Sequence, residues 1–433
     1  MEFVSIKSFI KNLIPKGAWK LLHNTRAYVA TAPYRKGLMI AERNVRKKDG
    51  PLNVLFFVIY ESMWKCDSLF QLMQNDAKFN PMIVVCPIGH KGNEYMVQTM
   101  KQCMRFFQEK GYPCIAAYDE KSDSYKDPME YNPDIIFYTR PYEAEVDYRY
   151  WRNRYKKVLS CYLNYFYVSN NEPWSCAEYF HQSLWRYYLE YPALQKQINE
   201  FLSPYHLNGR VVGYPLFDAF RMHKASDNDW PLVGRRRKHV IWAPHFSITG
   251  HTGINAFSTF EKYYDFMPKL AEKYKDEIEI VFKPHPVLKL SLYEAEVWGK
   301  ERTDAYYEKW EKGENTAFVD GEYVGLFWAS DAMIYDCNSF TVEYLAVNKP
   351  AMFLDSGMTD DKINEAGKEA RACYYKGYCE KDIEKFIKMI IEGGEDELKE
   401  KREAFYKNYI LPPNGKLAAE NIIDDLLTSL GRQ

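Results

Sequence analysis

The sequence predicts an α/β protein with two Rossmann-like domains, because strand and helix patterns alternate in two separate series. The first series opens with the apolar run LNVLFFVIY (52–60) and the second with VIWAPH (240–245). Gly213 and Pro215 interrupt the pattern between them, and 433 residues suit two cores of roughly 200 residues each. Ligands of parallel sheets bind beyond the carboxyl ends of the strands, so we expect the two domains to face a cleft.

Composition indicates a globular protein, with 46% hydrophobic and 27% charged residues. The net charge of −1 does not indicate a nucleic-acid partner. The nine cysteines show no CxxC spacing, so neither zinc nor a disulfide framework is expected and the reduced cytoplasm is the default compartment. Aromatic residues reach 16%, which serves core packing first and also suits the binding of sugars and polyols.

Four segments follow from the pattern. They are a basic leader (1–48), a first Rossmann-like domain (49–215), a second Rossmann-like domain (216–395) and C-terminal helices (396–433). The leader contains eleven Lys or Arg against two acidic residues. Its apolar side chains recur at helical spacing and end at a proline: Phe3, Ile6, Ile10, Leu13, Ile14, then Pro15. Such a helix either lies on an anionic membrane surface or packs on the domain behind it.

No apolar run approaches the ~20 residues that cross a bilayer, and lysines interrupt the only stretch that resembles a cleaved signal. We therefore expect a cytoplasmic protein that is peripheral on the inner face of the cell membrane.

In the first series, continuous apolar runs predict strands that are buried on both faces. The predicted strands are 52–60, 81–88, 113–118, 133–139 and 156–163. A helix is expected over 66–76, with Asp67 or Ser68 near its start, and another over 93–111, ending at Gly111.

The second series repeats the alternation and then becomes helical. The predicted strands are 240–245, 278–286, 316–320, 331–336 and 350–355. The predicted helices between them are 256–274, 292–312, 323–330 and 339–347, followed by 380–394, 396–410 and 417–430. The last of these is amphipathic and closes the chain.

Polar side chains follow three strands of the second domain. His245 follows the first, Lys283 and His285 follow the second, and the stretch 336–339 follows the fourth, with Glu343 one turn further on. Each of these has an ordinary structural explanation taken alone, such as helix capping or a hydrogen-bonded buried histidine. Together they would place a cation, imidazoles and the N–H groups of a helix start at one edge of the sheet, as a diphosphate requires.

Three stretches resemble the CDP-glycerol glycerophosphotransferase family, which includes teichoic-acid primases and polymerases and capsule-associated relatives. They are VVGYPLFDAF, VFKPHP and ASDAMIYDCNSFTVEYLAVNKPAMFL, within residues 205–355. The resemblance implies a GT-B fold and a CDP-linked polyol donor bound by the second domain. It also implies a glycan or lipid-linked acceptor held by the first domain, with no other cofactor and no catalytic metal.

The resemblance also implies roles for individual residues. Lys283 and His285 match a motif that contacts the donor phosphates, and Asn338 and Ser339 match a second phosphate motif at the start of a helix that continues with Phe340. Glu343 matches the acidic position that follows, where a carboxylate could accept hydrogen bonds from the ribose hydroxyls.

The general base is the point where the chain departs from the family. A Trp-His-Gly motif that supplies the proposed base in better-known members is missing, and Asn164 stands at the nearest position. An amide cannot take a proton, so the candidates are His245, His90 and Glu61.

Two alternatives remain open at this point. A nucleotide-sugar glycosyltransferase of the same fold would need the same phosphate pocket, but it would release a nucleoside diphosphate instead of CMP. A catalytically inactive member would serve as a scaffold in a capsule complex, and the missing Trp-His-Gly motif is the feature that favours it.

Overall fold

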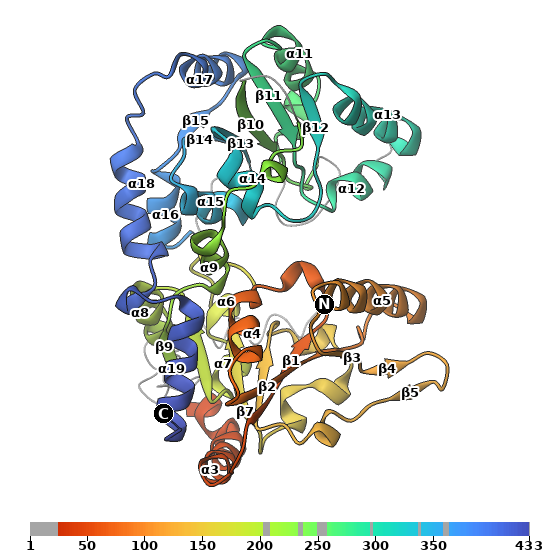
Figure 1. The fold of residues 1–433 in the computed structure, drawn as a ribbon, viewed down its shortest axis with the longest axis vertical. Coiled ribbons are helices and arrows are strands. Elements are labelled where there is room, and N and C mark those ends of the chain that lie inside the picture. Colours follow the sequence, from red (N-terminus) through yellow and green to blue (C-terminus); the bar gives the residue numbers. More distant parts are fainter. Residues whose placement is uncertain are drawn as a thin grey trace, which may run out of the picture. The chain divides into compact units, whose positions relative to one another are not determined.

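The computed structural model of the chain describes residues 25–201, 208–232, 237–248, 258–294, 298–336, 339–357 and 363–432 (Figure 1). The predicted leader helix (3–14) and Asn338 lie outside these residues. The chain forms two compact units. Unit 1 runs to Asp218 and resumes at Pro412, and unit 2 comprises Ala219–Leu411.

Unit 1 contains a seven-stranded parallel sheet in the order β3-β2-β1-β6-β7-β8-β9. Its strands are β1 (Leu52–Val58), β2 (Phe79–Val85), β3 (Cys114–Ala116), β6 (Ile135–Tyr138), β7 (Leu159–Leu163), β8 (Arg186–Leu189) and β9 (Gly209–Val211). The strand order reverses direction between β1 and β6, which are neighbours in the sheet. A small antiparallel hairpin of β4 (Tyr118–Asp119) and β5 (Ser124–Tyr125) stands apart.

The apolar runs of unit 1 form strands because helices cover the sheet and bury them. The helices are α3 (Ala32–Arg46), α4 (Asp67–Gln74), α5 (Asn93–Glu109), α6 (Pro173–Cys176), α7 (Tyr179–Gln182) and α8 (Pro192–Phe201). The predicted leader segment thus includes α3, whose Leu38, Ala41 and Val45 belong to the core of unit 1.

The closing helix of the chain, α19 (Ala418–Leu430), completes unit 1 and packs against α4 and α3 (Figure 1). Its side chains Ile422, Leu426 and Leu430 lie in the same core. Asp218 holds the start of the helix, because its carboxylate accepts the N–H groups of Ala418 and Ala419 at 2.8 and 2.9 Å. The predicted C-terminal segment 396–433 is therefore divided between the two units.

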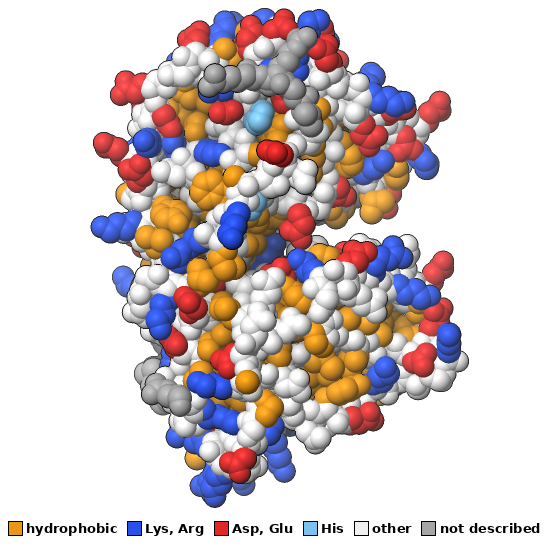
Figure 2. Space-filling view, viewed as in Figure 1, with side chains coloured by type: hydrophobic (Ala, Val, Ile, Leu, Met, Phe, Trp, Pro, Cys, Tyr) orange, Lys and Arg blue, Asp and Glu red, His pale blue; other side chains and the backbone are white. Residues whose placement is uncertain are grey.

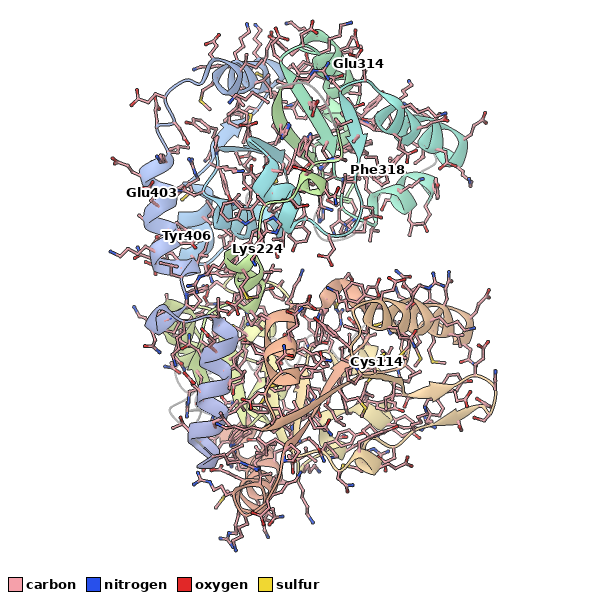
Figure 3. All side chains as sticks on the ribbon, viewed as in Figure 1. Cys114, Lys224, Glu314, Phe318, Glu403 and Tyr406 are labelled. Atoms are coloured by element: carbon pink, nitrogen blue, oxygen red, sulfur yellow. The ribbon has the colours of Figure 1, made fainter. Side chains whose placement is uncertain are left out.

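Unit 2 contains a six-stranded parallel sheet in the order β12-β11-β10-β13-β14-β15. Its strands are β10 (Lys238–Ala243), β11 (Ile278–Phe282), β12 (Thr316–Phe318), β13 (Ala332–Tyr335), β14 (Ala351–Leu354) and β15 (Tyr375–Gly377). Figure 3 labels Glu314, just before β12, and Phe318, its last residue, and so shows which way this strand runs. The order reverses between β10 and β13, and ligands of open parallel sheets bind at such a switch point.

The helices of unit 2 surround a core centred on Trp242, Phe282 and Trp310. They are α10 (Phe260–Tyr263), α11 (Phe266–Lys273), α12 (Leu288–Glu294), α13 (Gly299–Lys312), α14 (Val324–Ala329), α15 (Ser339–Glu343), α16 (Glu365–Arg371), α17 (Glu380–Glu392) and α18 (Lys399–Phe405), while α9 (Pro215–Met222) carries the chain from unit 1 into unit 2. Across the described parts of both units, no helix has the length and apolar character needed to span a bilayer.

Candidate active site

Two histidines meet at the ends of the neighbouring strands β10 and β11, beside the switch point of unit 2. His245 lies two residues beyond β10 and His285 three residues beyond β11, and their ring centroids are 5.2 Å apart. The backbone N–H of His285 donates to the carbonyl of Pro244 at 2.9 Å, which joins the two strand ends. Figure 2 shows pale-blue histidine side chains at the surface of this unit. The structure therefore brings together two of the residues that the sequence places after neighbouring strands.

In both imidazoles, Nδ1 accepts a hydrogen bond from a backbone N–H group. Nδ1 of His245 accepts the backbone N–H of Ser247 at 3.3 Å, and Nδ1 of His285 accepts that of Val287 at 3.2 Å. The hydrogen of each neutral ring is then on Nε2. Burial lowers the pKa of His245 to about 3, with a further contribution from His285, and it lowers the pKa of His285 to about 4. At neutral pH this arrangement suits donation of a hydrogen bond and not acceptance of a proton.

Asp336 is the buried anchor of this edge. It follows β13, and its carboxylate accepts the backbone N–H of His245 at 2.6 Å, the N–H of Thr259 at 2.5 Å and the hydroxyl of Thr259 at 2.9 Å. These bonds tie the loop after β10 to the start of α10. Burial raises the pKa of Asp336 to about 6, although all of its hydrogen bonds act in the opposite direction. The sequence places Asp336 in the polar loop but gives no sign of this anchoring role.

Lys283 and Glu343 lie on either side of one tyrosine. The ammonium of Lys283 donates to the carbonyl of Gly321 at 2.9 Å and lies 5.6 Å from the centroid of the Tyr323 ring. The Tyr323 hydroxyl donates to Oε2 of Glu343 at 2.6 Å. Both Lys283 and Glu343 are buried, so each needs these partners.

The helix start after β13 is described only in part. Ser339 begins α15, its side chain is outside the description, and the ring of Phe340 packs 5.3 Å from that of Tyr323 and 5.1 Å from that of Phe327. Phe340 therefore belongs to an aromatic cluster beside Lys283 and Glu343.

The two base candidates of unit 1, and Asn164 at the position of the missing motif, lie at three different strand ends. Glu61 follows β1 in a short 3-10 helix (Glu61–Met63) and accepts a hydrogen bond from Gln102 at 2.7 Å. His90 follows β2, is exposed, and has Nδ1 at 3.3 Å from the carbonyl oxygen of Glu145. Asn164 follows β7 and is buried, so its amide is a polar group within the packed interior of unit 1.

Glu190 is a buried carboxyl group that the sequence analysis missed. It follows β8, and its Oε1 accepts a hydrogen bond from Nδ2 of Asn164 at 2.9 Å. Its Oε2 has no hydrogen-bond partner in the described part of the chain. Burial raises the pKa of Glu190 to about 7. The Tyr187 hydroxyl donates to Oδ1 of Asn164 at 3.1 Å and completes this buried group.

A metal site is not evident in the described ranges, where no three His, Cys, Asp or Glu side chains gather as metal ligands. The strand ends of unit 2 present a lysine and two imidazoles, which are hydrogen-bond donors of the kind that can bind an anion.

Comparison with solved structures shows the fold. A variant of the wall teichoic acid polymerase TagF matches with a TM-score of 0.59 and 12% identity, over 96% of this chain and 97% of that chain. A protein described as a UDP-N-acetylglucosamine 2-epimerase from Listeria monocytogenes matches with a TM-score of 0.56 and 12% identity, over 88% and 97%. The UDP-GlcNAc 2-epimerase of Neisseria meningitidis, bound to UDP-GlcNAc, gives 0.53 and 14%, over 87% and 100%. These likenesses confirm the GT-B-like fold predicted from the sequence.

Comparison of sequences is more specific. No curated protein is significantly similar to the chain. The sequence model of the CDP-glycerol:poly(glycerophosphate) glycerophosphotransferase family matches residues 196–427, which is more than half of the chain and includes all of the strands of unit 2. The chain therefore belongs to the CDP-glycerol:poly(glycerophosphate) glycerophosphotransferase family.

Proposed function

We propose that this enzyme transfers glycerol phosphate, or a similar polyol phosphate, from a CDP-linked donor to a hydroxyl group of a glycan or lipid-linked acceptor. The acceptor oxygen forms a bond to the phosphorus that carries the polyol, the bond from that phosphorus to the CMP oxygen breaks, and CMP leaves with the electron pair. A displacement of this kind depends on positioning and on stabilisation of charge. The observation that carries the proposal is the pair of neutral imidazoles at the ends of β10 and β11, with the buried Lys283 directly after β11.

Within this proposal, unit 2 binds the donor. Lys283 supplies positive charge, and the Nε2–H groups of His245 and His285 donate to oxygens of the diphosphate. Asn338, Ser339 and Phe340 complete the phosphate site, a role that rests on the family motif. The carboxylate of Glu343, held by Tyr323, accepts from the ribose.

The proton of the acceptor hydroxyl is then left to another group, because Nδ1 of each imidazole already accepts a backbone N–H. Glu61 and His90 are the candidates that follow strands of unit 1. We place the reaction at the inner face of the cell membrane, in the synthesis of a teichoic-acid-like or capsular polymer, with the basic leader as the contact to anionic lipids.

The nucleotide that is released tests the reaction. The full chain is incubated with CDP-glycerol, CDP-ribitol, UDP-sugars and GDP-sugars, with and without a glycan acceptor, and the products are separated by chromatography. Release of CMP from a CDP-polyol supports the proposal. Release of UDP or GDP from a sugar donor would establish glycosyl transfer instead, and binding of CDP-glycerol without turnover would point to an inactive scaffold.

Replacement of Lys283 tests the donor site. Lys283→Gln removes the charge while keeping a donor for the carbonyl of Gly321, so we expect kcat/KM for the CDP-polyol to fall about 100-fold. The matched control is Lys262→Gln, because the ammonium of Lys262 also donates to a backbone carbonyl of unit 2, that of Tyr378 at 2.6 Å, but is exposed. Equal kinetics for both variants would remove Lys283 from the site.

A further inference from the structure

A partly buried arginine lies among tyrosines at the switch point of unit 1. Arg140 follows β6, and its guanidinium carbon is 5.8, 5.0 and 5.2 Å from the ring centroids of Tyr60, Tyr142 and Tyr165. These tyrosines follow β1, β6 and β7, which are consecutive neighbours in the sheet. We call this group the Arg140 cage. Its place between β1 and β6 is where an open parallel sheet binds its ligand.

Two nitrogens of the guanidinium have no oxygen acceptor among the described residues. Its NH2 forms an ion pair with Glu145, and its NH1 faces the thioether sulfur of Met63 at 2.6 Å, a weak acceptor. Its Nε has no partner in the part of the chain that the structure describes. The side chain is 13% exposed, so the group is largely desolvated yet can still be reached from solvent. A desolvated cation with so few oxygen acceptors is costly unless a ligand supplies them.

Arg152 of the same unit shows what a purely structural arginine looks like. It is 1% exposed, and its NH1 and NH2 donate to the carbonyls of Tyr155 and Ser183 at 2.7 and 3.0 Å. Both of its terminal nitrogens thus have oxygen acceptors and its side chain is almost fully buried, although its Nε, like that of Arg140, has no partner among the described residues. The two arginines therefore differ in the partner of NH1 and in exposure.

The walls of the cage are suited to a polyol. The hydroxyl of Tyr165 donates to that of Tyr142 at 3.5 Å, a long bond that a ligand hydroxyl can replace. Burial raises the pKa of Tyr60 to about 12, so this phenol stays neutral and can both donate and accept. Tyrosine faces also pack against the C–H groups of a carbon chain. An arginine fork, by contrast, selects a phosphate or a carboxylate.

We propose that the Arg140 cage binds a phosphate-bearing polyol, and that this is the end of the acceptor to which the next unit is added. The proposal adds a binding site to the proposed transferase function. The identification of the bound ligand as the acceptor rests on that function. The shared chemistry is an anionic phosphate next to a hydroxylated carbon chain, and it comes either from a single polyol phosphate or from the end of a polymer of such units.

Calorimetric titration of the full chain tests the binding. The probes are glycerol phosphate, a short glycerol phosphate oligomer, inorganic phosphate and glycerol. We expect both phosphate-bearing polyols to bind, inorganic phosphate to compete with them, and glycerol to bind at least tenfold more weakly. Tighter binding of the oligomer than of the monomer identifies a polymer end as the acceptor, and equal binding identifies a single unit. Equal affinity for glycerol and glycerol phosphate overturns the proposal.

Variants locate the binding in the cage. Arg140→Gln should weaken the binding of glycerol phosphate roughly 10- to 100-fold, because a charge-assisted hydrogen bond is lost. Arg149→Gln is the matched control, since Arg149 also pairs with a carboxylate, that of Asp147, and lies 3.8 Å from the ring centroid of Tyr125. Wild-type affinity in Arg140→Gln overturns the proposal. Where that variant does not fold, Arg140→Lys replaces it, because lysine keeps the charge and loses the planar fork.

A separate readout distinguishes failure of the cage from failure of the transferase function. Hydrolysis of CDP-glycerol by the full chain without acceptor reports on the donor site alone. We expect the control Arg149→Gln to keep the wild-type rate of CMP release and the wild-type KM for a glycerol phosphate acceptor, and Arg140→Gln to show a raised KM for that acceptor. A wild-type protein that releases no CMP counts against the transferase function, whereas the titrations still decide whether the cage binds phosphate.

Discussion

Asp336 and Glu190 are buried carboxyl groups at the carboxyl edges of their sheets, and their surroundings differ. Asp336 is surrounded by N–H and O–H donors, whereas Oε2 of Glu190 has none in the described ranges. Burial raises the pKa of both. Asp336 therefore holds a loop in place through these hydrogen bonds. Glu190 lacks a donor at Oε2, so its carboxyl group keeps its proton to a higher pH.

Stability against pH tests the state of Glu190. The pKa of this carboxyl is raised from the ordinary 4.5 to about 7, so the folded protein keeps a proton that the unfolded chain loses in this range. The free energy of unfolding should fall as pH rises from 4.5 to 7, by about 3 kcal/mol for this group. Glu190→Gln cannot ionise and should gain stability relative to wild type as the pH rises, when both are unfolded in urea at acidic, neutral and mildly basic pH.

The control is Glu109→Gln, an exposed glutamate of α5 in the same unit. Its difference from wild type should not change with pH. Parallel pH profiles for Glu190→Gln and wild type would show that Glu190 is charged in the folded protein.

Sequence reasoning reached some of these residues and not others for a physical reason. Lys283 and His285 follow the apolar run 278–282 directly, so the strand and its end could be predicted together. Glu190 follows β8, whose RYYL sequence has no aliphatic run, so neither strand nor carboxylate was expected. The direction of each imidazole hydrogen bond depends on loop N–H groups that only the folded backbone positions.

Among the elements, Gly213 lies at a crowded junction of unit 1. Its φ is +98°, and a Cβ placed there would lie 2.7 Å from Cβ of Pro412, where the chain returns to this unit. Gly213→Ala should destabilise unit 1 by about 2–4 kcal/mol, from backbone strain plus the steric clash. Gly50→Ala is the control, with φ +81° and nothing within 4 Å of the added atom, and should cost about 1 kcal/mol. Chemical denaturation measures both, and equal losses would show that Pro412 moves away freely.

Long apolar runs gave reliable element predictions, and short or mixed ones did not. β1, β11 and β13 lie inside predicted strands, and β2 begins two residues before the strand predicted there. β8, β9 and β15 were not expected, because their sequences RYYL, GRV and YKG contain no continuous aliphatic run. The helix predicted over 256–274 was wrong in extent: it is divided into α10, which begins at Phe260, and α11, with a two-residue turn at 264–265 between them. The helix predicted over 339–347 ends as α15 at Glu343 and continues as a 3-10 turn.

At the scale of the molecule, each unit has its own core, and α19 belongs to the first. Leu426 is fully buried in unit 1, so Leu426→Ala should remove about 2–5 kcal/mol from the stability of that unit. Hydrogen exchange should speed up in β1 and β6 and stay unchanged in β10 and β13. Ile387→Ala, in α17 of unit 2, is the mirror control and should do the reverse. Equal effects on both sheets would show that the units unfold as one.

The periodicity of the sequence does not predict which of the two units the C-terminal segment joins. The pattern at 417–430 predicts an amphipathic helix correctly, but an apolar face does not say which of two cores it covers. The carboxylate of Asp218, two hundred residues earlier in the chain, decides this by accepting the first N–H groups of the helix.

The return of the chain at Pro412 has a consequence for protein engineering. Neither unit corresponds to a simple N-terminal or C-terminal half of the chain. A fragment that ends at Asp218 would leave the core of unit 1 without the aliphatic side chains of α19. Chimeras that exchange unit 1 with a relative therefore need two crossover points, and the protein that supplies unit 1 has to supply α19 as well.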